Sequence, residues 1–166
     1  GRPARRSLSR PAPGAGMNQS DLMIKRISLG ALGDEWHDLV RDGYHTDYAG
    51  MGELYAHVET AEEKIVQMQR WGEGIEAWTA REGGRLVGML TGDVGGEQLT
   101  IYDFFVARSH RGRGIGRELL ATALATPDVR RFAAEINVAN TASRALFESC
   151  GFRPARTVSW YVRDED

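Results

Sequence analysis

The chain has 166 residues, of which 42% are hydrophobic and 27% charged, a composition typical of one globular domain with a sizeable core. The net charge is −2, but residues 1–16 hold four arginines and no acid, so the remainder carries about −6, which argues against nucleic acid as the main partner and is consistent with a cationic substrate. No apolar run is long enough to span a membrane, a single cysteine excludes an internal disulfide, and the scattered histidines form no metal-binding pattern, so we expect a cytoplasmic protein without a metal.

The first segment, residues 1–16, is rich in Arg, Pro, Gly, Ala and Ser and lacks the apolar stretch of a secretory signal. We interpret it as a disordered extension or a remnant of the expression vector, with Met17 as a plausible natural start. The rest of the chain, residues 17–166, is expected to form one domain.

From residue 17 onward, hydrophobic periodicity and turn residues predict a strand, two helices, three antiparallel strands, a helix, a strand, a helix and a last strand. The expected strands are 22–27, 75–81, 86–94, 99–106, 131–138 and 156–163. Asp34 and Asn140 are typical helix N-caps, and Thr60 with Glu63 forms a capping box. This order predicts an α/β (α+β) fold, a mixed and mostly antiparallel twisted sheet with helices on both faces.

The segment that links the fourth expected strand to the third expected helix reads RGRGIG at 111–116. A glycine-rich turn that leads into a helix leaves backbone N–H groups unpaired, and the helix dipole adds positive charge there. This predicts a site for a phosphate or pyrophosphate, surrounded by Arg111, Arg113 and Arg117. The spacing of the glycines fits neither a P-loop nor a dinucleotide fingerprint.

Two motifs in this part of the chain together resemble those of one enzyme family. The first, Arg111-x-x-Gly114-x-Gly116 after a strand, resembles the acetyl-CoA motif of the GNAT superfamily of N-acetyltransferases. The second, Asn140-x-x-Ser143-x-x-Leu146-Phe147-Glu148-x-x-Gly151-Phe152, is similar to the family's next motif, Asn-x-x-Ala/Ser-x-x-Leu-Tyr-Glu-x-x-Gly-Phe. The resemblance covers roughly residues 86–155, and upstream of it only the order of elements matches. It implies the GNAT fold.

The resemblance also implies where the acetyl donor binds. In GNAT enzymes the fourth and fifth strands splay apart, and the pantetheine arm of acetyl-CoA pairs with the backbone of the fourth strand. The pyrophosphate lies on the glycine-rich turn, and the thiol end lies near the helix that follows the fifth strand. The donor-binding residues implied are Phe104, Phe105, Val106, Arg111, Gly112, Arg113, Gly114, Ile115, Gly116, Arg117, Asn140, Ser143 and Phe147.

The reaction implied is direct attack of an amine on the thioester, which needs a base, a donor to the oxyanion and an acid for the thiolate. Strand alternation places Asp103 on an apolar face of the fourth strand, and a carboxylate with apolar neighbours suits a base that works near neutral pH. The other residues of that face are Leu99, Ile101 and Phe105. Glu135 is the second candidate base, and either acid could instead be structural. The family implies a backbone N–H at a bulge near Val106 as the oxyanion donor.

The expected acceptor is the primary amine of a small cationic molecule that is aminoglycoside-like, polyamine or amino-acid-like. The tripeptide 101–103, Ile-Tyr-Asp, is loosely similar to the small aminoglycoside 3-N-acetyltransferases. Residues 44–58 mix tyrosine, histidine, glycine and acids in the manner of a binding loop, and the family commonly shapes its acceptor pocket there. The candidates for acceptor contacts are Asp47, Tyr48, Glu53 and Tyr55.

Two other functions stay open at this point. Residues 132–140 are loosely similar to the corresponding stretch of ribosomal-protein acetyltransferases, which favours a protein N-terminal or lysine acetyltransferase. Phe147 stands where the family motif has its tyrosine general acid and has no hydroxyl, which favours a non-catalytic acyl-CoA-binding module. Family members are often dimers, so a homodimer is a further expectation.

Overall fold

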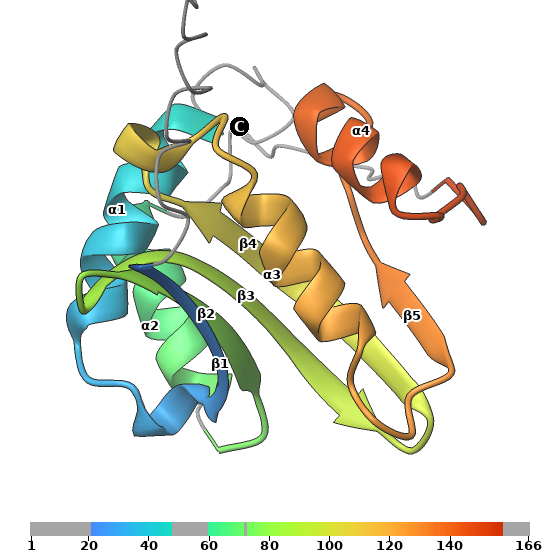
Figure 1. Cartoon of the computed structure of the whole chain (residues 1–166), viewed down its shortest axis with the longest axis horizontal. Helices are drawn as coiled ribbons and strands as arrows, with labels where there is room; N and C mark the ends of the chain where they lie inside the picture. The colour runs from blue at the N-terminus through green and yellow to red at the C-terminus, as the bar shows by residue number, and fades with distance from the viewer. Residues whose placement is uncertain (1–20, 48–59, 72, 158–166) are drawn as a thin grey trace, which may run out of the picture.

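The computed structural model describes residues 21–47, 60–71 and 73–157 (Figure 1). The elements are β1 (Leu22–Ser28), the 3-10 turn η2 (Leu29–Ala31), α1 (Glu35–Asp47), α2 (Ala61–Trp71), β2 (Glu76–Glu82), β3 (Arg85–Gly95), β4 (Gln98–Val106), the 3-10 turn η4 (Arg108–His110), α3 (Ile115–Leu124), β5 (Arg131–Ala134) and α4 (Thr141–Ser149). The strands form one sheet in the order β1-β2-β3-β4-β5. Neighbours are antiparallel except β4 and β5, which run parallel. The predicted mixed, mostly antiparallel sheet is confirmed.

Helices cover both faces of the sheet, as predicted (Figure 1). On one face α1 and α2 bury Trp36, Val40 and Met68 against the sheet. On the other face α3 buries Leu119 and Leu120. Because successive strand residues point to opposite faces, β2 and β3 supply apolar side chains to both clusters and are buried along their central residues.

Two of the predicted helix caps are confirmed by hydrogen bonds. The Thr60 N–H donates to Glu63 Oε2 at 2.6 Å and the Glu63 N–H donates to Thr60 Oγ1 at 3.3 Å, which is a complete capping box. At α4, Asn140 Oδ1 accepts the Ser143 N–H at 3.0 Å. Gly151 follows this helix in the left-handed region, with φ of 91°.

One predicted strand is much shorter in the structure than expected. Strand β5 ends at Ala134 rather than at residue 138, because it pairs with β4 only from Gln98 to Ile101 and then leaves the sheet. The predicted last strand, 156–163, falls mostly outside the described residues, and its first two residues have no regular structure. No described helix is long and apolar enough to cross a membrane.

A bulge in β4 decides which way the site residues point. Asp103 pairs with Thr91 and Ile101 pairs with Gly92, so Tyr102 is an extra residue with no partner on β3. As a result Ile101 packs on the α3 face, whereas Phe105 packs on the α1–α2 face. The prediction that Leu99, Ile101, Asp103 and Phe105 share one face is therefore wrong, because simple alternation ignores the extra residue.

Gly92 lies opposite the bulge, where close packing leaves no room for a side chain. A Cβ there would lie 2.7 Å from the Thr100 carbonyl oxygen and 2.8 Å from Leu99 Cδ1. We expect Gly92→Ala to lower the free energy of unfolding by about 1–3 kcal/mol, since backbone cannot move away as easily as a flexible side chain. Urea denaturation measures this, with Gly74→Ala as the control because a Cβ at Gly74 meets no atom within 4 Å. Equal stability of Gly92→Ala and wild type would contradict the close β3–β4 contact.

Candidate functional site

The site begins at an edge of β4 that has no strand beside it among the described residues. Strand β3 pairs with β4 as far as Val106, whereas β5 pairs with it only as far as Ile101. The Ala107 N–H donates to the Val87 carbonyl at 2.9 Å, so alternation turns the N–H and C=O of Val106 to the opposite edge. There Arg111 Nε donates to the Val106 carbonyl oxygen at 3.1 Å. Backbone polar groups of β4 are thus available at this edge.

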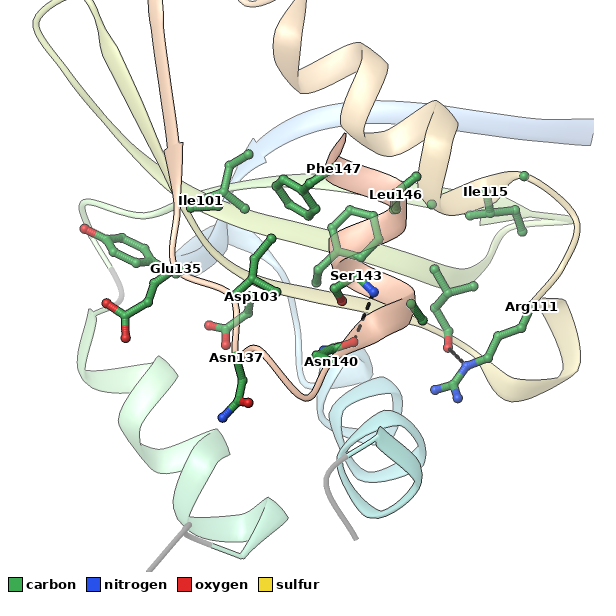
Figure 2. A pocket seen from close by; sticks show the side chains of 18 of the residues that line it. Ile101, Asp103, Arg111, Ile115, Glu135, Asn137, Asn140, Ser143, Leu146 and Phe147 are labelled. Atoms are coloured by element: carbon green, nitrogen blue, oxygen red, sulfur yellow. Dashed lines mark hydrogen bonds between the residues drawn. The ribbon is translucent and has the colours of Figure 1, made fainter. Parts of the chain in front are cut away.

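A cavity of about 380 Å³ lies along this edge. Its walls are the second half of β4, the turn before α3, the segment after β5 and one side of α4 (Figure 2). The volume lies within the range of small-molecule sites. The lining residues are Ile101, Tyr102, Asp103, Phe104, Val106, His110, Arg111, Gly112, Gly114, Ile115, Gly116, Ala134, Glu135, Ile136, Asn137, Asn140, Ala142, Ser143, Leu146 and Phe147.

One end of the cavity is the amino terminus of α3. Gly112 and Gly114 have φ of 72° and 83°, left-handed values that let the chain turn sharply into the helix. The first helical hydrogen bond runs from the Glu118 N–H to the Gly114 carbonyl at 3.0 Å, and no side chain caps the helix. The N–H groups at 115–117 precede that bond, so this end offers aligned donors and the positive end of the helix dipole to an anion.

The three arginines expected around this anion site do not all reach it. Arg111 lines the cavity, and Figure 2 shows it beside Ile115 at the α3 end. Arg113 instead forms an ion pair with Glu82, and Arg117 Nη2 donates to Ser149 Oγ at 2.9 Å. Neither of these two side chains lines the cavity.

Helix α4 forms an apolar wall of the cavity. Asn140, Ser143, Leu146 and Phe147 project from it or from its cap toward β4 (Figure 2). The Phe147 ring is 4% exposed and packs against two other rings, 6.2 Å from that of Phe104 and 4.9 Å from that of Phe152. Phe105, also expected here, faces α1 and α2 instead, as the β4 bulge requires.

At the other end of the cavity Asp103 is held by an ion pair. Lys64 Nζ of α2 lies 3.0 Å from Asp103 Oδ1, and the Thr91 hydroxyl lies 3.4 Å from Oδ2. The side chains of Lys64 and Asp103 are 15% and 4% exposed. The Lys64 ammonium also lies 5.0 Å from the centre of the Trp71 ring. The expectation of an Asp103 with only apolar neighbours is wrong.

Glu135 presents a carboxylate of a different kind. It follows the last residue of β5, is exposed, and makes no hydrogen bond or ion pair with another described residue. Figure 2 shows Glu135 at the same end of the cavity as Asp103 and Asn137. The bulge residue Tyr102, 46% exposed, also lines this end, and its ring lies 5.6 Å from that of Trp71. This end can receive a cation, while the α3 end can receive an anion.

Comparison with protein families identifies this architecture. A model described as "Acetyltransferase (GNAT) family" matches residues 35–152. The chain belongs to this family. A comparison with curated protein sequences gives no significant match.

Solved structures share the GNAT fold of this chain. The PaiA N-acetyltransferase of Thermoplasma acidophilum, in complex with coenzyme A, has a TM-score of 0.65 and 17% identity over 82% of this chain and 92% of its own. An aminoglycoside acetyltransferase from an uncultured soil metagenomic sample, in complex with sisomicin, has a TM-score of 0.61 and 16% identity over 87% and 97%. Ribosomal-protein-alanine N-acetyltransferase from Brucella melitensis biovar Abortus 2308 has a TM-score of 0.59 and 21% identity over 87% and 99%. At these identities the likeness shows the fold.

The residues predicted to contact the acceptor are not placed at the cavity by the described part of this GNAT chain. Asp47 is the last residue of α1, and Tyr48, Glu53 and Tyr55 lie outside the described residues. The bulge that the family resemblance placed near Val106 lies at Tyr102. Sequence reasoning missed Lys64, because α2 carries several charged residues and nothing in the sequence distinguishes this one. Only the fold shows that it pairs with Asp103.

Proposed function

We propose that the chain is an acetyl-CoA-dependent N-acetyltransferase that acts on the primary amine of a small cationic molecule. One observation carries the proposal: a single cavity joins the uncapped amino terminus of α3 to the exposed carboxylate of Glu135 along the free edge of β4. A donor with an anionic end and an acceptor with a cationic end would approach this cavity from its two ends.

The residues present suit the donor. The N–H groups of the turn and of the first turn of α3 suit its pyrophosphate, and Arg111 adds positive charge beside them. The backbone of Phe104 and the N–H of Val106, on the edge of β4 that β5 does not cover, can pair with amide groups of the pantetheine arm. Leu146 and Phe147 supply an apolar wall for its thiol end. When bound, acetyl-CoA supplies a thioester carbonyl that an uncharged amine attacks directly.

Glu135 is the residue we assign as base, because its carboxylate has no partner among the described residues. It can pair with the incoming ammonium group and take its proton, directly or through one water, which leaves the nitrogen lone pair free to form the new bond to the acetyl carbon. After the attack, the nitrogen gives up its remaining extra proton to solvent, and the carbon–sulfur bond breaks. The thiolate takes a proton from solvent, since Phe147 cannot donate one. Backbone N–H groups along β4 are the donors available to the oxyanion.

Asp103 has a different role in this proposal. Its charge is already balanced by Lys64, so an incoming ammonium group would have to displace that lysine in order to pair with it. Asp103 therefore fixes the bulge residue Tyr102 and α2 beside the acceptor end rather than receiving the amine itself. The −6 charge of the chain beyond residue 16 supports a cationic acceptor, and the single cysteine supports a cytoplasmic location.

The proposal is tested by thiol release from acetyl-CoA with a panel of amines. The panel holds aminoglycosides, polyamines, amino acids and short peptides with a free amino terminus, and mass spectrometry identifies the acetylated product. We expect turnover with one class of small cationic amine. Turnover with peptides alone would favour the protein acetyltransferase, and CoA binding without turnover on any amine would favour the binding module.

A further inference from the structure

The turn that carries the anion site is attached to the rest of the fold from outside the cavity. It runs from Ala107 to Gly114, between β4 and α3. Near its start the Arg108 N–H donates to Asp42 Oδ2 of α1 at 2.7 Å. Further along, His110 and Arg113 both contact Glu82, the last residue of β2. A hairpin far away in sequence thus holds the turn.

Glu82 bridges two residues of this turn with its two carboxylate oxygens. Oε2 lies 2.8 Å from Nε2 of His110, and Oε1 lies 2.5 Å from Nη2 of Arg113. Arg113 Nη1 also donates to Oε2 at 3.3 Å, so the guanidinium and the carboxylate meet through two nitrogens. These contacts, and chiefly the hydrogen bond from Arg113, lower the pKa of Glu82, so the carboxylate stays charged at neutral pH.

The bridge fixes the orientation of a residue inside the cavity. His110 lines the cavity, and its side chain is 13% exposed. Its second ring nitrogen, Nδ1, lies 2.7 Å from Ser109 Oγ, so both ring nitrogens have partners. The same bridge draws the Arg113 side chain away from the cavity and explains why that arginine does not line it.

We propose that Glu82 is a positioning residue for donor binding, which holds the turn 107–114 so that His110 and the amino terminus of α3 face the cavity. This rests on the proposed function. Without the bridge, the glycines of the turn would allow many conformations, and each bound donor would have to order the turn again. The negative charge of Glu82 also lies near the turn, where it repels the anionic donor and weakens its binding. The two effects have opposite signs, so an experiment can separate them.

The test is titration of CoA by calorimetry, together with steady-state kinetics in acetyl-CoA and in amine. We expect Glu82→Ala to weaken CoA binding and to raise the KM for acetyl-CoA by about tenfold, with kcat and the KM for the amine unchanged. Glu82→Gln, which keeps the shape and loses the charge, should lie between this variant and wild type. Glu97→Gln is the matched control, because Glu97 pairs with Arg130 on the surface at 3.4 Å, outside the cavity lining.

Each other outcome overturns the proposal in a recognisable way. CoA binding unchanged in both Glu82 variants would mean that the bridge does not position the turn. Tighter binding in both would mean that the carboxylate acts only by repelling the donor. Equal losses in kcat and in both KM values would indicate general damage to the fold. If wild-type protein bound no CoA at all, the proposed function would fail as well, which separates that failure from the others.

Discussion

Replacing Glu135 by glutamine is expected to lower kcat by about 10²-fold or more, which is the usual contribution of a positioned base. Glutamine keeps the size and hydrogen-bonding reach of the side chain but cannot accept the proton. Since Glu135 is exposed and makes no hydrogen bond or ion pair with another described residue, the stability of the protein should not change. Thiol release under saturating acetyl-CoA and amine measures kcat, and thermal unfolding serves as the check on folding.

Asp103→Asn is the matched comparison for Glu135→Gln, because both remove one carboxylate from the same end of the cavity. We expect a smaller effect on kcat from Asp103→Asn, at most about tenfold, together with a loss of stability. The reverse order, a large kcat loss in Asp103→Asn and none in Glu135→Gln, would assign the base to Asp103. In that case Lys64 would have to leave Asp103 when the amine binds.

The second large effect concerns stability. We expect Asp103→Ala to lower the free energy of unfolding by about 2–4 kcal/mol, because it leaves the Lys64 ammonium in a largely buried position without its carboxylate partner. This expected loss is at the lower end of the range for a buried ion pair, since the Lys64 side chain keeps some contact with water and with the Trp71 ring. Urea denaturation of each variant measures the loss.

A double-mutant cycle isolates this pair from other effects. Lys64→Met removes the charge and keeps the aliphatic length, so the double variant with Asp103→Ala should be less destabilised than the sum of the two single changes. Glu148→Ala is the surface control, because Glu148 faces Arg144 at 3.8 Å on an exposed side of α4 and its loss should cost at most about 0.5 kcal/mol. Strictly additive losses would show that Lys64 and Asp103 do not depend on one another.

The parts of the fold that could be predicted from sequence are those set by local signals. The capping box at Thr60 and the cap at Asn140 are complete within four residues, so their side-chain types alone locate the helix starts. The turn before α3 is likewise local, because Gly112 and Gly114 adopt left-handed conformations that favour glycine. The location of the proposed donor end of the cavity follows from this turn.

The proposed acceptor end could not be predicted in the same way, because contacts distant in sequence determine it. The bulge at Tyr102 depends on how β4 pairs with β3, and it reverses the face on which Asp103 and Phe105 lie. The ion pair that holds Asp103 comes from Lys64, on a helix 39 positions earlier in the chain. The bridge from Glu82 to Arg113 could not be predicted either, because the sequence offers many other oppositely charged partners for both residues.

In the proposed function, one cavity holds the donor between β4 and the segment after β5. A crystal structure of the protein with CoA tests it most directly. We expect the pyrophosphate on the backbone N–H groups of 112–116 and the pantetheine arm along the free edge of β4, with its thiol pointing toward Glu135. CoA bound elsewhere, or bound with its thiol turned away from Glu135, would contradict the proposed site.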